Sequence, residues 1–134
     1  VKGADNAINR YEKDLKPFKS DLTIIFLGTN DAANRVSLDV FENNYSTMIE
    51  NVKKWNSQSK VFLVGILPRE DIDYQTIKSY NSVIQNISRV YKVHFIDTSD
   101  WLFDRDFSDD IHPSLQSQIK ISEKFLKIIL PIIN

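Results

Sequence analysis

The hydrophobic positions of this chain form two alternating kinds of pattern. Three short runs are rich in β-branched and aromatic residues: LTIIFLG (22–28), KVFLVGILP (60–68) and KVHFID (92–97). Their length and composition predict three strands. The first two runs are apolar without alternation, which is typical of strands that are covered on both faces in a parallel sheet.

Longer segments carry apolar residues three or four positions apart, and they lie at 5–18, 37–56, 74–91 and 113–130. This spacing predicts four amphipathic helices. Ser37 suits an N-cap and Pro113 suits a first helical position. Because helices and strands alternate along the chain, we expect an α/β fold with parallel strands and right-handed crossovers.

The predicted fold indicates where chemistry should lie. In open α/β sheets, ligands bind beyond the carboxyl ends of the strands. The segments that follow the three strands are GTNDAANR (28–35), PREDID (68–73) and DTSDWLFDRDFSDDIH (97–112). We therefore look for functional residues in these three segments.

Composition narrows the possible classes of function. The 134 residues suit one domain, residues 1–134, because no repeat or linker divides them. The net charge of -1 gives no electrostatic argument for binding nucleic acid or an anionic membrane. The chain has no cysteine, which excludes disulfides and thiolate metal sites, and no apolar run approaches the roughly 20 residues of a transmembrane segment. Localisation stays open, with a bacterial secreted or cell-surface protein as one option.

The GTND segment contains the first candidate residue. Gly28 allows a sharp turn after the strand, and Asn30 brings a side-chain amide to the carboxyl edge of the sheet. Such a donor can stabilise a developing oxyanion. The alternative is a purely structural Asx turn that joins the strand to a helix.

The second candidate is the pair Asp109 and His112. A carboxylate three residues before a histidine could hold one ring nitrogen and leave the other free to act as a base. The alternative is a solvated loop and helix cap, with Asp110 as a competing carboxylate. The only other histidine, His94, falls in the middle of a predicted strand rather than at its end, which favours a structural role.

Together, GTND after the first strand and DDIHP before the last helix resemble the SGNH hydrolase family, the GDSL-type lipases and esterases. The resemblance implies a three-layer αβα, flavodoxin-like parallel sheet. It also implies that Asp109 and His112 are the catalytic acid and base, and that Asn30 lies in the oxyanion hole. Gly3, in VKGADNAINRYEKDL, is the implied second oxyanion-hole residue. No cofactor is implied, and the substrates would be small-molecule, lipid or glycan esters.

The nucleophile block of that family, Gly-Asp-Ser, is missing from this sequence. The family places it before Gly3, together with further strands. The run LTIIFL would otherwise lie at the edge of a three-stranded sheet, where an apolar strand is prone to unwanted pairing. We therefore expect residues 1–134 to be the C-terminal portion of a larger domain, with the serine in a segment upstream of Val1.

Other functions remain open from the sequence. The same site could transfer an acetyl group to a glycan, with a sugar hydroxyl replacing water. A non-catalytic binding module is also possible, because the nucleophile is missing. A flavodoxin-like nucleotide or phospho-acceptor domain is less favoured, because GTNDAANR has no glycine-rich phosphate cradle. Arg35 and Arg69 lie where they could contact an anionic group or form part of the ordinary charged surface.

Overall fold

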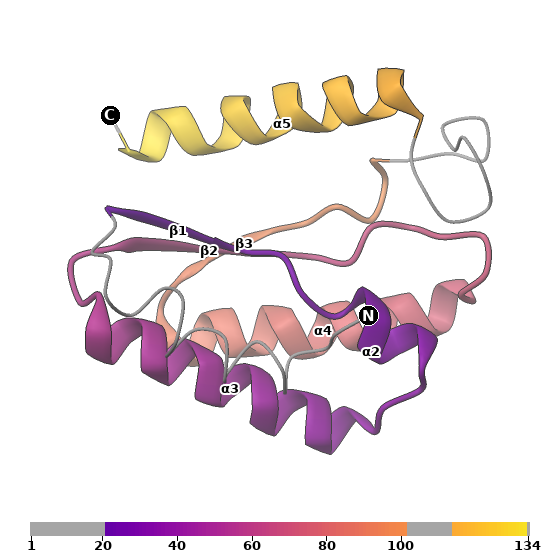
Figure 1. Ribbon diagram of the computed structural model, residues 1–134, viewed down its shortest axis with the longest axis horizontal. Coiled ribbons are helices and arrows are strands. Elements are labelled where there is room, and N and C mark those ends of the chain that lie inside the picture. The colour runs from indigo at the N-terminus through magenta and orange to yellow at the C-terminus, as the bar shows by residue number, and fades with distance from the viewer. Residues whose placement is uncertain (1–20, 102–113, 134) are drawn as a thin grey trace.

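The computed structural model describes residues 21–101 and 114–133 (Figure 1). The predicted helix over 5–18 and the predicted helix start at Pro113 lie outside these ranges. Within them, the elements follow in this order: β1 (Leu22–Ile25), α2 (Thr29–Ala33), α3 (Leu38–Trp55), β2 (Lys60–Val64), α4 (Tyr74–Tyr91), β3 (His94–Ile96) and α5 (Leu115–Ile133).

The three strands form a parallel sheet in the order β1-β2-β3. Leu22 pairs with Lys60 at the start of β1, and Phe62 pairs with His94 at the start of β3. Helices α3 and α4 lie on one face of the sheet and α5 lies on the other (Figure 1). The predicted three-layer α/β architecture is therefore confirmed.

The central strand β2 explains why both faces of the sheet are covered. Its residues 61–64 are all buried. Val61 and Leu63 belong to the core that includes α3 and α4, whereas Phe62 and Val64 pack in a second core with Ile129 of α5. Successive side chains of a strand point to opposite faces, so an unbroken apolar run fills two cores at once. This confirms the prediction made from KVFLV.

Helices α3 and α4 both begin at side-chain caps. The Ser37 hydroxyl accepts a hydrogen bond from the Val40 N–H at 3.3 Å, as the sequence predicted. Asp73 accepts from the Gln75 N–H at 2.9 Å at the start of α4 and also from the Thr76 hydroxyl. These two hydrogen bonds, that from Thr76 first, lower the pKa of Asp73 because they favour its charged form.

The segment after the first strand turns at Gly28 and continues as the short helix α2 over residues 29–33. One prediction about local structure was wrong. His94 does not lie in mid-strand; it is the exposed first residue of β3, and its ring stacks on Phe62 with centroids 4.7 Å apart. His94 therefore lies at the amino ends of the strands, whereas the segments with the candidate site residues follow their carboxyl ends.

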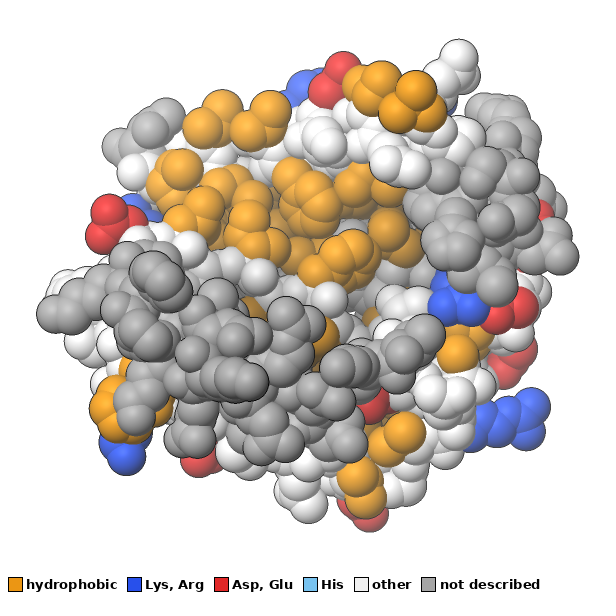
Figure 2. Space-filling view, in the orientation of Figure 1, with side chains coloured by type: hydrophobic (Ala, Val, Ile, Leu, Met, Phe, Trp, Pro, Cys, Tyr) orange, Lys and Arg blue, Asp and Glu red, His pale blue; other side chains and the backbone are white. Residues whose placement is uncertain are grey.

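An apolar surface extends over β1 and α5. Ile24 and Phe26, in and just after β1, are each 45% exposed, and α5 exposes Ile119 and Leu126. Figure 2 shows apolar side chains gathered in a broad area on this side of the molecule. In the described part of the chain, β1 pairs with one strand only, so it is an edge strand despite its apolar composition. We call Ile24, Phe26, Ile119 and Leu126 the β1–α5 face.

Among the described residues, none of the helices combines the length and the apolar character that a membrane crossing requires.

Candidate active site

The turn between β1 and α2 is built around Gly28. Its φ angle is 120°, in the left-handed region that side chains disfavour, and its carbonyl accepts the Ala32 N–H at 2.9 Å. A Cβ at this position would lie 3.0 Å from Ile66 Cδ1 and 3.1 Å from Phe41 Cζ. Backbone conformation and close packing therefore both require glycine here.

Asn30 lies two residues beyond this glycine, in the first turn of α2. Its residue is partly buried, and its carbonyl accepts the Asn34 N–H at 2.9 Å. Since α2 follows the carboxyl end of β1, Asn30 lies at the edge of the sheet where ligands are expected. Its location agrees with the sequence analysis, and its catalytic role stays a prediction.

Tyr80 of α4 holds the segment that leaves α2. Its hydroxyl donates to the Val36 carbonyl and, at 3.4 Å, to the carbonyl of Asp31. The Asp31 side chain is itself buried, with 3% of its surface exposed. Burial raises the pKa of Tyr80, and the nearby Asp31 carboxylate raises it further, so the phenol keeps its proton for these contacts. No sequence pattern predicts these contacts of Tyr80 and Asp31.

Asn81, the next residue of α4, holds the chain where it leaves β2. The Ile66 N–H donates to Asn81 Oδ1 at 2.6 Å, and Asn81 Nδ2 donates to the Ile66 carbonyl at 3.2 Å. Thr98 Oγ1 donates to the same carbonyl, also at 3.2 Å. An amide placed four residues after Ile77 and three before Ile84, on the buried stripe of α4, was the available signal for this contact.

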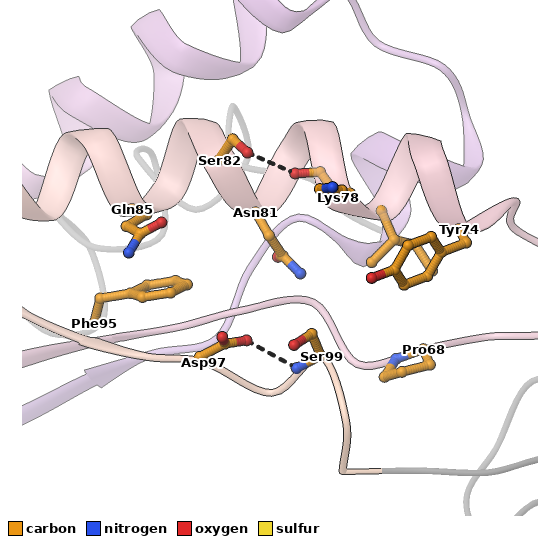
Figure 3. A pocket seen from close by; sticks show the side chains of 10 residues that line it. Pro68, Tyr74, Lys78, Asn81, Ser82, Gln85, Phe95, Asp97 and Ser99 are labelled. Carbon is orange, nitrogen blue, oxygen red and sulfur yellow. Dashed lines mark hydrogen bonds between the residues drawn. The ribbon is translucent and has the colours of Figure 1, made fainter.

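A small pocket of about 190 Å³ opens between α4 and the segments that follow β2 and β3. Figure 3 shows Asn81 reaching toward it from α4, with Asp97, Ser99 and Pro68 on the opposite side. Asp97 accepts the Ser99 N–H at 3.0 Å. The volume of this pocket is below the roughly 300 Å³ of pockets that enclose drug-sized ligands, so it can hold only a small group.

The remaining predicted residues have different outcomes. Asp109, His112 and Gly3 lie outside the described residues, as does Asp110. Arg69 forms a two-pronged ion pair with Asp71, at 2.7 Å from Nε and 2.5 Å from Nη2, so its guanidinium already has a partner. This contact lowers the pKa of Asp71. Arg35 is exposed just after α2, at a φ of 54°.

Residues 21–101 and 114–133 contain no group of histidine and acidic side chains able to hold a metal ion. The arrangement that they do contain is a tightly packed turn with an amide-bearing residue at the carboxyl edge of the sheet. Such a turn can present hydrogen-bond donors to a negative charge.

Comparison with known protein families shows which family has this arrangement. The GDSL-like lipase/acylhydrolase family matches residues 2–118, which include the GTND turn and both residues of the Asp109–His112 pair. The chain belongs to this family. It is therefore an enzyme of the esterase or acyl-hydrolase class. No curated protein sequence matches the chain.

Solved structures share the fold of this GDSL-like chain. An acetylxylan esterase from Geobacillus stearothermophilus superposes with a TM-score of 0.81 at 20% identity, covering 94% of this chain and 67% of that one. A protein described as an acylhydrolase, from Bacteroides fragilis, gives 0.83 at 20% identity, with 99% and 72% covered. A protein described as a lipolytic G-D-S-L family member, from Desulfitobacterium hafniense, gives 0.82 at 19% identity, with 96% and 76% covered.

Catalytic variants of the Geobacillus stearothermophilus esterase are also among the solved structures. They change a serine near its start, an aspartate, and a histidine three residues after that aspartate.

Gly28→Ala should destabilise this GDSL-like protein and disturb its site together. The positive φ costs on the order of 1–3 kcal/mol for a side chain, and the new methyl group must push against Ile66 and Phe41. Chemical denaturation measures the loss of unfolding free energy. Asn34→Ala, at the exposed end of the same helix, is the control. A change at Gly28 of less than about 0.5 kcal/mol, the size of an ordinary surface effect, would contradict this account of the turn.

Proposed function

We propose that this chain supplies the acid–base pair and part of the oxyanion hole of a serine-type ester hydrolase. The observation that carries the proposal is the Gly28–Asn30 turn, packed at the carboxyl end of β1 in a chain of the GDSL-like family. A turn this closely packed keeps its donors in one place, and pre-positioned donors are what stabilise a developing oxyanion.

The proposed mechanism assigns one role to each residue. A serine from a segment upstream of Val1 attacks the ester carbonyl, and His112 takes the serine proton and then gives it to the leaving alcohol. Asp109 orients His112 and stabilises its protonated ring. Asn30 and the Gly3 N–H hold the negative oxygen. Water then attacks the acyl-serine ester while His112 takes the water proton. His112 returns this proton to the serine as the acyl group leaves.

The spacing of the acid–base pair supports this assignment. Asp109 precedes His112 by three residues, and the same interval separates the catalytic aspartate and histidine of the Geobacillus stearothermophilus esterase. A short interval lets a carboxylate reach the near ring nitrogen while the far nitrogen faces the nucleophile.

The proposed substrates are esters of short acyl groups, including acetyl esters of glycans. Support comes from the acetylxylan esterase among the solved structures.

We further propose that the segment carrying the nucleophile covers the β1–α5 face, and that residues 1–134 are the C-terminal portion of one larger domain. The support is physical: β1 is apolar on both faces yet has one strand neighbour among the described residues. An additional strand beside β1 and a helix over Ile24 and Phe26 would remove this edge. The solved structures are also longer than the part that this chain covers.

Active-site labelling tests the proposed function. In the protein extended upstream of Val1, a fluorophosphonate probe should form one serine adduct, detected by mass spectrometry after digestion. His112→Ala should slow labelling by about 10²-fold or more, because it removes the general base. His94→Ala is the matched control, since His94 is exposed at the amino end of β3. A folded protein that forms no serine adduct would rule the mechanism out.

Asn30→Ala should lower kcat for a nitrophenyl acetate ester by about 10²- to 10³-fold, as loss of one oxyanion-hole donor does, with little change in KM. Asn34→Ala makes the same chemical change at the other end of α2, where the side chain is exposed, and should keep the kcat of the unaltered protein. Equal effects of the two variants would remove Asn30 from the oxyanion hole.

Ile24→Ala should cost about 2–5 kcal/mol of unfolding free energy in the extended protein, the range for a buried isoleucine. Val90→Ala changes a residue that is 73% exposed on α4 and should stay within about 0.5 kcal/mol. Denaturant titration compares the two. If Ile24→Ala stays below about 1 kcal/mol, a value that strand propensity alone explains, nothing covers the β1–α5 face.

A further inference from the structure

We propose that Tyr80 and Asn81, consecutive residues of α4, are positioning residues for the Gly28–Asn30 turn. They touch no reacting atom; they contact Ile66 and Phe41, the two side chains that pack most closely on Gly28. This inference rests on the proposed function of Asn30, and it adds a second layer of residues behind the oxyanion hole.

Asn81 holds the backbone of Ile66 in place. Its side-chain amide pairs with both backbone groups of Ile66, accepting from the N–H at 2.6 Å and donating to the carbonyl at 3.2 Å. Two opposed hydrogen bonds fix both the position and the rotation of a peptide segment, as a neighbouring strand would. Figure 3 shows the Asn81 side chain extending from α4 toward the segments at the end of the sheet. Asn81 thus holds Ile66 after β2 has ended at Val64.

The Ile66 side chain in turn packs on the Gly28 turn. The Ile66 side chain is fully buried, and its Cδ1 lies where it would meet a Cβ on Gly28 at 3.0 Å. The glycine backbone therefore rests directly on the side chain that Asn81 holds. A shift of Ile66 toward or away from α4 would carry Gly28 with it, since close-packed interiors transmit displacement.

Tyr80 contacts Phe41, the second side chain that packs closely on Gly28. Its ring packs edge-on against Phe41 with centroids 4.9 Å apart, and Phe41 Cζ is the second atom that a Cβ on Gly28 would meet, at 3.1 Å. Its hydroxyl also donates to the Val36 carbonyl and, more weakly, to that of Asp31. Tyr80 thereby fixes both the Phe41 ring beside Gly28 and the segment that follows α2.

We use the word bracket for the contacts of Asn81 with Ile66 and of Tyr80 with Phe41 and Val36. Adjacent residues of a helix point about 100° apart, so Tyr80 and Asn81 can reach β1–α2 and β2 respectively from one rigid element. Helix α4 begins at the Asp73 cap and packs on α3, which carries Phe41. The carboxyl ends of β1 and β2 are thus held in one arrangement by two neighbouring side chains.

A structural role without positioning is the competing explanation, and kinetics separates the two. In the protein extended upstream of Val1, Asn81→Ala should lower kcat by about 10- to 100-fold, because a small displacement of a catalytic donor has effects of this size, while KM stays nearly unchanged. Tyr80→Phe keeps the ring against Phe41, removes only the hydroxyl, and should lower kcat by about 3- to 10-fold. Asn86→Ala, an exposed asparagine on the same helix, should change neither constant.

Amide hydrogen exchange gives a second readout that requires no activity. The Ala32 N–H donates to Gly28 and the Val36 N–H donates to Asp31. Exchange at these two amides should be faster in Asn81→Ala and Tyr80→Phe than in the unaltered protein, and unchanged in Asn86→Ala. The inference is overturned if the folded variants keep kcat within about twofold and exchange at this turn is unaltered. It is equally overturned if kcat falls only in proportion to the folded fraction.

The outcomes also separate this inference from the proposed function. An unaltered protein with neither ester hydrolysis nor a serine adduct would refute the hydrolase, whereas the exchange measurement would still decide whether the bracket exists. Should Asn81→Ala fail to fold, Tyr80→Phe carries both measurements, since its ring still fills the core.

Discussion

The parallel register of β2 with both of its neighbours is the constraint on which the rest of the molecule depends. Pairing Leu22 with Lys60 and Phe62 with His94 brings the carboxyl ends of all three strands to one edge. Residues far apart in sequence, such as Gly28, Ile66 and Thr98, then meet within a few ångströms. The same pairing buries β2 on both faces, so the site lies at the end of the most buried strand of the sheet.

The layer structure could be predicted because long periodic segments leave a strong signal. Helix α4 has the predicted bounds of 74–91, since its apolar stripe repeats over five turns and Asp73 supplies a cap. The short helix α2 could not be predicted in the same way. Five residues are too few to show a 3.6-residue period, and the preceding Gly28 indicates a turn. His94 was misplaced because the apolar run does not mark where pairing begins.

The candidate site was predictable at one level and hidden at another. Asn30 could be placed from the sequence, because a Gly-x-Asn segment after an apolar strand must lie at the carboxyl edge. The contacts of Tyr80 and Asn81 behind Asn30 could not be predicted in this way. Asn81 is 15 residues from its partner Ile66, and Tyr80 is 44 residues from Val36. On a buried helical stripe these two residues look like ordinary packing positions, and only the tertiary structure reveals which backbone groups they hold.

The β1–α5 face has a consequence for how the protein survives in a cell. A fragment or a stalled translation product that displays Ile24, Phe26, Ile119 and Leu126 without a cover would present the kind of surface that chaperones and proteases recognise. Its unpaired β1 edge would also invite pairing with a second copy. Cellular abundance would then report on whether this face is covered, because quality control would remove chains in which it stays bare.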